Sequence, residues 1–320
     1  MTRRRQQQRS RETFWRDQPG LFDFIADDTD DASVLSPMSD EDLCVPERLR
    51  YMSFGSGSSG NCAYIGTASC GLLIDAGVDN EFVENSLRAN GVDADTIRGI
   101  LLTHDHGDHV KYAYSILRRH RNMRLYATPK AFGGVLRRHS ISRRIKDYHQ
   151  PIHKEFPFQI GPLTITAFET SHDGTDNAGF IIEGFGVSFV VATDMGKVTA
   201  RADYYIRQAS HLMIESNYDL AMLRNGHYPR HLKARIESAI GHLDNADAAS
   251  YLADVAAAGT LKRVFLCHLS QDNNTPEIAV ATVGGALVEA GYEICTGDVA
   301  DGRLHLSALP RLEATSLIFL

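Results

Sequence analysis

The 320-residue sequence has few cysteines, a single tryptophan and no long hydrophobic run. Its five cysteines are scattered and form no Cys-x-x-Cys pair, which disfavours a disulfide framework or a cysteine-rich zinc site. No apolar stretch reaches the roughly 18–20 residues that cross a bilayer, and the basic N-terminal stretch lacks the apolar core of a secretory signal. These absences predict a soluble cytoplasmic protein without a membrane partner.

The chain also lacks the basic excess that is typical of general nucleic-acid binders. It contains 33 Lys and Arg against 40 Asp and Glu, a formal net charge of −7. That charge is unevenly distributed, because residues 110–146 contain eleven Lys and Arg and no Asp or Glu. The overall sign therefore does not exclude nucleic acid, since it averages an acidic chain with one strongly basic segment.

Composition divides the chain into two regions. Blocks of like charge and weak periodicity predict a disordered extension over residues 1–48, with an aromatic patch that either docks on a partner or packs loosely on its own domain. Apolar patterning predicts a domain over residues 49–320. Strands are expected at 49–54, 63–65, 71–75, 97–103, 163–168, 178–183, 187–192 and 263–267, and helices at 80–90, 111–119, 129–139, 232–240, 246–258 and 276–290. Strands in two groups with helices between and after them indicate a layered α/β protein.

The most informative segment follows the strand expected at 97–103. It places His104, His106, Asp108 and His109 within six residues, around a glycine. Imidazole and carboxylate groups are the ligands of zinc or manganese. Three histidines this close would repel one another when protonated and would gain nothing as core residues. One ion does not comfortably use all four groups, so the pattern favours two divalent ions.

Further candidate ligands follow other expected strands. These are Asp75, His172, Asp194 and His268. Functional residues at strand ends, held by a rigid core, are the usual placement in α/β proteins. Each residue taken singly is more often structural or a helix cap, and only the histidine cluster makes metal binding the better interpretation.

These residues resemble the five motifs of metallo-β-lactamase-fold hydrolases, and the resemblance covers about residues 50–300. Further segments resemble the YycJ/WalJ branch of that fold: 53–61, 73–77, 215–219, 226–229, 232–236 and 241–245. The resemblance implies a four-layer αββα sandwich with a dinuclear site at one edge of two facing sheets. By motif, the first metal would be held by His104, His106 and His172. The second would be held by Asp108, His109 and His268, with Asp194 bridging and Asp75 fixing the histidine loop by hydrogen bonds.

The catalytic roles follow from this arrangement. Two adjacent metal ions activate a water and offset charge on the attacked centre, and Asp108 could also orient that water. His242 is the candidate proton donor, although it could equally be a helix-terminal histidine without a catalytic part. Ser58, Ser59 and Asn61 lie in a glycine-rich loop whose amides could receive phosphate oxygens, or which is a plain turn.

The basic segment bears on the substrate. Its cations follow the ligand cluster and could hold a polyanionic backbone, with these arginines as candidates: Arg137, Arg138, Arg143 and Arg144. The alternative is a solvated helix face, although such faces usually mix charges of both signs. We expect a phosphodiesterase, and the resemblance points to a DNA 5′-to-3′ exonuclease. Hydrolysis of a small phosphodiester or other small ester, and a metal-bound regulatory module without activity, remain open. The sequence leaves the metal (zinc or manganese), DNA or RNA, and the oligomeric state undecided.

Overall fold

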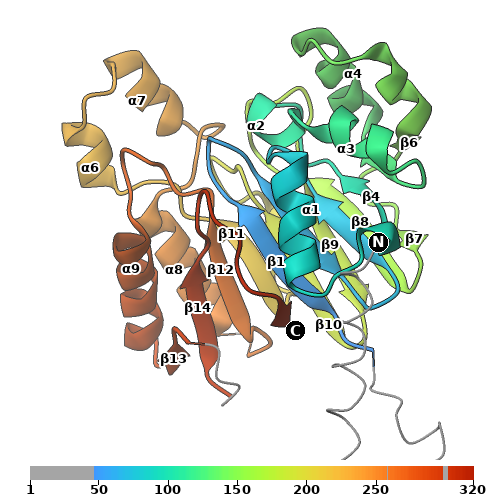
Figure 1. Ribbon diagram of the computed structural model, residues 1–320. Helices are drawn as coiled ribbons and strands as arrows, with labels where there is room; N and C mark the ends of the chain where they lie inside the picture. The colour runs from blue at the N-terminus through green and yellow to red at the C-terminus, as the bar shows by residue number, and fades with distance from the viewer. Residues whose placement is uncertain (1–46, 258, 298–301) are drawn as a thin grey trace, which may run out of the picture. The chain divides into compact units, whose positions relative to one another are not determined.

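The computed structural model describes residues 47–257, 259–297 and 302–320, which form two β-sheets with helices on their outer faces (Figure 1). Apart from Glu47 and Arg48, the extension predicted for residues 1–48 lies outside the described residues, and its disorder stays a prediction. Within the described residues, no helix is both long and apolar enough to cross a membrane.

The first sheet has seven strands and combines both pairing directions. In spatial order they are β15 (Ile318–Phe319), β1 (Arg50–Gly55), β2 (Cys62–Gly66), β3 (Gly71–Ile74), β4 (Ile97–Leu101), β5 (Arg124–Ala127) and β6 (His149–Pro151). The pairs β3–β4, β4–β5 and β5–β6 are parallel, whereas β15–β1, β1–β2 and β2–β3 are antiparallel.

The second sheet has eight strands. In spatial order they are β13 (Ile294–Cys295), β14 (Leu304–Ala308), β12 (Arg263–Cys267), β11 (His211–Glu215), β10 (Val187–Ala192), β9 (Ala178–Gly184), β8 (Leu163–Glu169) and β7 (Phe158–Ile160). The strands from β13 to β10 are parallel, and those from β10 to β7 are antiparallel. The C-terminal ends of β10, β11 and β12 therefore meet at one edge.

Helices belong to both halves of the chain. The first half has α1 (Asn80–Ala89), η2 (Ala94–Thr96), α2 (Gly107–Val110), α3 (Ala113–Arg119), α4 (Pro129–Arg138) and η3 (Arg143–Tyr148). The second half has α5 (Ala200–Ile206), α6 (Leu220–Asn225), α7 (Arg230–Ile236), α8 (Asn245–Ala256) and α9 (Pro276–Glu289). Threonine side chains cap α4 and α9, each just before a proline at the first helical turn. A hydroxyl cap followed by proline is a strong helix start, because proline needs no amide partner there.

Three layers of buried apolar side chains hold this arrangement together. The inner layer lies between the sheets, and the two outer layers join each sheet to its helices. Alternation along β12 shows how one strand serves two layers: Phe265 packs in the inner layer, while Val264 and Leu266 face the helices. Two sheets between two helical layers confirm the predicted four-layer αββα sandwich.

Eight of the strands were predicted, whereas β5, β6, β7, β11, β13, β14 and β15 and helices α2, α5 and α6 were not. Two of the differences concern segments that lead to the candidate site. Strand β11 was not expected, because its apolar centre of three residues is flanked by polar but buried His211 and Glu215. The helix expected at 232–240 instead spans Arg230–Ile236. It stops because the chain turns back on itself, and a Cβ at Gly241 would lie 2.2 Å from the Ile236 oxygen.

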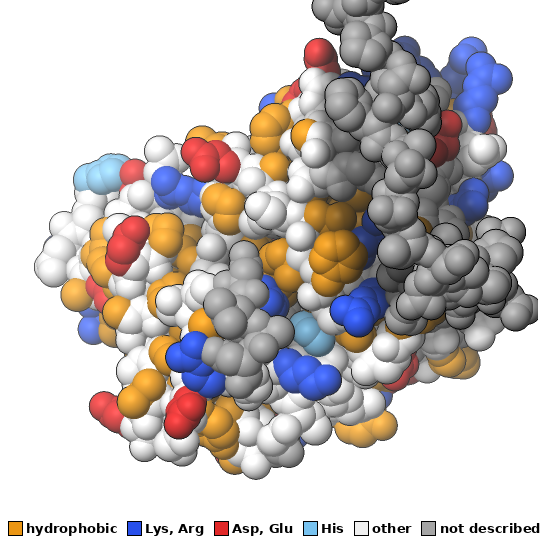
Figure 2. Space-filling model, turned by 60° about the horizontal axis from the view of Figure 1, so that its bottom comes forward, with side chains coloured by type: hydrophobic (Ala, Val, Ile, Leu, Met, Phe, Trp, Pro, Cys, Tyr) orange, Lys and Arg blue, Asp and Glu red, His pale blue; other side chains and the backbone are white. Residues whose placement is uncertain are grey.

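The helices divide into two groups at the upper end of the molecule in Figure 1. There α2, α3 and α4 lie on one side, and α6 and α7 lie on the other. Figure 2 shows the lower end turned toward the viewer, where hydrophobic side chains and charges of both signs are interspersed. The loops with the candidate ligands leave the sheets at the upper end, between the two groups of helices.

Candidate metal centre

The loop after β4 carries the histidine cluster and is fixed by Asp75. Its carboxylate accepts a hydrogen bond from the Thr103 amide at 2.8 Å, and Nδ1 of His109 donates to its other oxygen at 2.7 Å. A close approach also requires glycine at position 77, because a Cβ there would lie 1.6 Å from the Asp108 carbonyl oxygen. Asp75 therefore sits where the sequence placed it, bonded to the loop that carries the candidate ligands.

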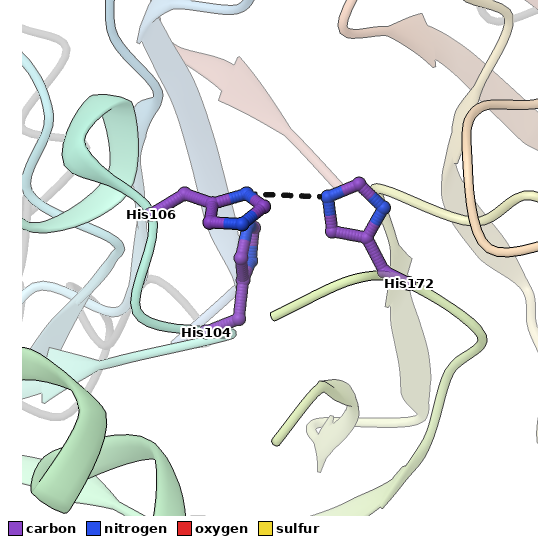
Figure 3. A group of neighbouring side chains, drawn as sticks. All are labelled: His104, His106 and His172. Carbon is purple, nitrogen blue, oxygen red and sulfur yellow. Dashed lines mark hydrogen bonds between the residues drawn. The ribbon is translucent and has the colours of Figure 1, made fainter. Parts of the chain in front are cut away.

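Three histidines converge from two loops (Figure 3). Nδ1 of His106 lies 3.3 Å from Nε2 of His172, and the His104 ring is 4.6 and 5.0 Å from the other two ring centres. His172 donates through Nδ1 to the Gly241 carbonyl at 2.9 Å, which turns its Nε2 toward the cluster. The structure thus brings together the three residues predicted to hold the first metal.

A second cluster adjoins the first. The Oδ2 atom of Asp108 lies 3.5 Å from Nε2 of His109 and 3.6 Å from Nε2 of His268. Asp194 lies between the two clusters, with one oxygen 3.3 Å from Nε2 of His109 and the other 3.8 Å from Nε2 of His172. All seven predicted ligands therefore meet in one place, and Asp194 lies between the two clusters.

Three strand-end residues of this centre have left-handed backbone conformations. The φ angles are 59° for Asp75, 53° for Asp194 and 55° for His268. Residues with side chains rarely adopt this region, and it persists where the surrounding structure fixes it. These turns redirect the chain at the ends of β3, β10 and β12, so that each side chain projects from the sheet edge.

Neighbouring charges shift the pKa values of the groups at this centre. Burial alone would raise the pKa of Asp108, but His109 and His268 outweigh it and hold that pKa well below its ordinary value. Burial also opposes charge on His109 and His268, yet the carboxylates, Asp194 above all, raise the pKa of both rings well above the ordinary value. Burial and then His109 lower the pKa of His104. The pKa shifts of Asp108, His109 and His268 therefore favour the charged form of each group, and that of His104 favours the neutral ring.

The donor set fits divalent metal ions. The buried Nε2 atoms of His104 and His268 have no hydrogen-bond partner among the described residues. Their Nδ1 atoms do have partners: His104 donates to the Thr103 hydroxyl at 3.0 Å, and His268 donates to Glu215 at 2.8 Å. Two ligands on one tetrahedral zinc ion lie about 3.3 Å apart, close to the separations within both clusters. Orienting one ring nitrogen so that the other faces a metal is the usual arrangement of histidine ligands.

Glu215 is the buried residue at this site whose role sequence reasoning missed. It appears in the sequence only as part of a motif of the YycJ/WalJ branch, and it is the last residue of β11, a strand that was not predicted. Its Oε1 accepts from Nδ1 of His242 at 2.7 Å and from Nδ1 of His268, and its Oε2 accepts from the amides of Met195 and Leu243. The predicted proton donor, His242, thus lies at the centre, 5.0 Å from the His172 ring.

Two further aspartates next to candidate ligands were also missed. Asp105 is fully buried and accepts from the amide and hydroxyl of Thr175 at 2.8 and 2.6 Å, which ties the loop after β4 to the loop before β9. Asp173 has one oxygen 3.2 Å from Nε2 of His106 and the other 2.7 Å from Nε of Arg235. Adjacency to a ligand was the only signal in the sequence for either residue.

The three substrate contacts predicted in the glycine-rich loop differ in their exposure. Ser58 and Ser59 are exposed at the tip of the glycine-rich loop, whereas Asn61 is buried. The Asn61 amide donates to the Asp108 carbonyl, and its side-chain nitrogen lies 3.1 Å from Oδ2 of Asp108 and 2.9 Å from Nε2 of His109. Both amide groups of Asn61 are therefore engaged with the candidate ligands rather than turned outward.

The four predicted arginines are exposed at the end of α4 and in η3. Arg138 is tied to the centre, because its Nε lies 3.5 Å from Oδ2 of Asp105. The structure therefore links one of the four directly to the ligand loop, and Arg137, Arg143 and Arg144 are exposed on the surface.

The chain belongs to the β-lactamase superfamily: the family described as "Beta-lactamase superfamily domain" matches residues 71–269. This is a hydrolase superfamily, and its metallo-β-lactamase fold implies divalent metal ions. The chain is 33% identical to exodeoxyribonuclease YycJ of Bacillus anthracis over 252 residues. These residues cover 77% of this chain and 92% of that protein.

A second relative and a solved structure agree with this placement. Exodeoxyribonuclease WalJ of Streptococcus pneumoniae is 32% identical over 242 residues, which cover 76% of this chain and 89% of that protein. The metallo-β-lactamase fold protein YhfI from Bacillus subtilis superposes with a TM-score of 0.59 at 14% identity, over 84% of this chain and 99% of that one. The latter likeness concerns the fold alone.

Proposed function

We propose that this protein is a metal-dependent phosphodiesterase that degrades DNA as an exonuclease, acting from the 5′ end. The observation that carries the proposal is the pair of ligand clusters joined by Asp194, in a chain about one third identical to relatives named exodeoxyribonucleases. Such a centre also suits hydrolysis of a small phosphodiester or another small ester, so the substrate needs support from the residues around it.

Two divalent ions, zinc or manganese, would supply a hydroxide at neutral pH and positive charge for the attacked phosphorus centre. The residues that would hold them are His104, His106 and His172 in one cluster and Asp108, His109 and His268 in the other, with Asp194 between. Asp75 and Glu215 each accept from Nδ1 of a ligand histidine, at 2.7 and 2.8 Å. They fix the orientation of His109 and His268 and keep the Nε2 atoms directed into the centre.

His242 is the proton donor of this proposal. Hydrolysis of a phosphodiester releases an alkoxide, which needs a proton as the bond breaks. Glu215 accepts from Nδ1 of His242 at 2.7 Å, which fixes the ring and leaves Nε2 for the leaving group. The His242 ring lies 5.0 Å from that of His172 and 5.1 Å from that of His268, so it borders both clusters.

The basic segment supports a polyanionic substrate. Arg137, Arg138, Arg143 and Arg144 are exposed, and Arg138 contacts Asp105, which lies between two candidate ligands. Exposed cations next to the centre would position phosphates of a nucleic acid without reading its bases. A small ester would not extend to these residues, which favours DNA over the smaller substrates.

Digestion of end-labelled DNA tests the function. Protein loaded with zinc or manganese is incubated with single- and double-stranded oligonucleotides labelled at either the 5′ or the 3′ end. We expect stepwise shortening from the 5′ end, dependent on metal and absent after chelation. No degradation with either metal would overturn the nuclease proposal, and hydrolysis of bis(p-nitrophenyl) phosphate alone would replace it with a small-substrate phosphodiesterase.

A further inference from the structure

Helix α7 carries an arginine that reaches the candidate metal centre from the side opposite the basic segment. Nη2 and Nε of Arg235 lie 2.6 and 2.7 Å from Oδ2 of Asp173. The other oxygen of Asp173 lies 3.2 Å from Nε2 of His106 and 3.5 Å from Nε2 of His172. Only one carboxylate therefore separates the guanidinium from two rings of the three-histidine cluster.

The chain on both sides of Arg235 is fixed. On its N-terminal side, Nζ of Lys233 donates to the carbonyl oxygens of Arg224 and Gly226 at 2.8 and 2.6 Å, which joins α7 to the end of α6. On its C-terminal side, the Gly241 carbonyl accepts from His172 itself. Arg235 is thus held beside the centre by the fold rather than by its ion pair alone.

Asp173 is a partner that Arg235 can leave. The Asp173 side chain is 21% exposed and that of Arg235 is 57% exposed, so both members of the pair are accessible to a ligand. The ion pair between Arg138 and Asp105, on the side of the basic segment, is different. Asp105 is fully buried and also accepts two hydrogen bonds from Thr175. An ion pair that is open to solvent contributes little to stability, so the loss of this contact upon binding of another anion costs little.

The ion pair with Asp173 does not use the two parallel N–H groups of the Arg235 guanidinium fully. Both Nε and Nη2 are directed at the same oxygen of Asp173, because the other oxygen faces His106 and His172. A phosphate presents two oxygens that match the two parallel N–H groups of arginine. A phosphate at the mouth of the centre would therefore be a better partner than this carboxylate.

We infer that Arg235 binds a phosphate of the substrate beside the three-histidine cluster, and that it exchanges Asp173 for this phosphate when substrate enters. The inference rests on the proposed phosphodiesterase function and deepens it. Arg235 and Arg138 then hold the substrate from the two sides of the centre, since α7 and α4 lie on opposite sides of it in Figure 1.

The test compares Arg235→Gln with Arg230→Gln, which removes the same charge from the same helix. Arg230 is exposed and makes no ion pair among the described residues. We expect Arg235→Gln to raise KM about tenfold for both DNA and bis(p-nitrophenyl) phosphate, with a smaller change in kcat. Arg230→Gln should change KM and kcat less than twofold for both substrates. Arg235→Lys should recover part of the loss.

A second readout does not depend on turnover. Fluorescence anisotropy of a labelled oligonucleotide with the metal-free protein should show weaker binding for Arg235→Gln than for Arg230→Gln. Asp173→Asn should not weaken binding further when combined with Arg235→Gln, because the two residues act through the same exchange.

The outcomes separate the inference from the function. Equal effects of the Arg235 and Arg230 variants on a DNA-cleaving protein would overturn the inference and leave the nuclease standing. A fall in kcat with lower metal content and unchanged KM would also overturn it, since that result means a structural role near His106. A protein that hydrolyses only the small diester, with the predicted Arg235 defect, would overturn the nuclease and leave the inference standing. Absence of both activities and of DNA binding would overturn both.

Discussion

Nδ1 of His242 donates to the buried carboxylate of Glu215 at 2.7 Å, and the same oxygen of Glu215 accepts from Nδ1 of His268 at 2.8 Å. One carboxylate therefore orients both the proposed proton donor and a candidate metal ligand. The Met195 and Leu243 amides hold the other oxygen in place. The orientation of both rings at the site therefore depends on one buried carboxylate.

Replacing Glu215 by Gln should lower kcat about 100-fold, because the ring of His242 loses its fixed tautomer and His268 loses a charged partner. The pH–rate profile should also change on the limb that reports the proton donor. Glu237→Gln is the matched control, since this exposed carboxylate pairs only with Arg224 at 3.5 Å. A Glu215→Gln variant with wild-type kcat and pH profile would remove Glu215 from the mechanism.

Asp108→Ala should abolish hydrolysis of every phosphodiester while leaving the fold intact, because Asp108 joins the second cluster without being part of an apolar layer. Circular dichroism and thermal unfolding check the fold, and metal analysis should show a loss of bound metal. Asp95→Ala, which changes a carboxylate that is 90% exposed, should be as active as the wild type. Retained turnover in the Asp108 variant would refute the dinuclear mechanism.

Replacing Arg137, Arg138, Arg143 and Arg144 together by Ser should weaken DNA binding and flatten its dependence on salt. The slope of log K against log salt should fall by about one for every phosphate that the variant no longer neutralises. Hydrolysis of bis(p-nitrophenyl) phosphate serves as the internal control, because this small diester should require at most Arg138. An unchanged salt slope would mean that these arginines form only a solvated surface.

Metal uptake should release protons and weaken as the pH falls. The pKa of His109 and of His268 is raised in the metal-free protein, first by the charge of Asp194 against the opposing effect of burial. Both rings therefore carry a proton at neutral pH that must leave before Nε2 can bind a metal ion. Titration calorimetry with zinc in buffers of different ionisation enthalpy measures the protons released. Uptake without proton release between pH 6 and 8 would contradict these charges.

The sequence alone was sufficient to propose the candidate ligand set, because each candidate follows a strand or lies in one short run. His104, His106, Asp108 and His109 are neighbours in the chain, and Asp194 and His268 each end an apolar stretch. Local hydrophobic patterning also indicated most strands, so the layered fold could be predicted. Short β11 could not, because its ends are polar residues that only tertiary packing buries.

Only the tertiary structure decided how the ligands are supported. Glu215 and His242 are 27 residues apart, and Asp173 and Arg235 are 62 apart, so no local pattern could pair them. The same holds for Asn61, which was a candidate phosphate contact in a glycine-rich loop and is buried against Asp108, 47 residues away. The sequence indicates which groups are candidate metal ligands, because they follow strands whose ends meet at one edge. The contacts that orient those groups arise only when separate loops meet there.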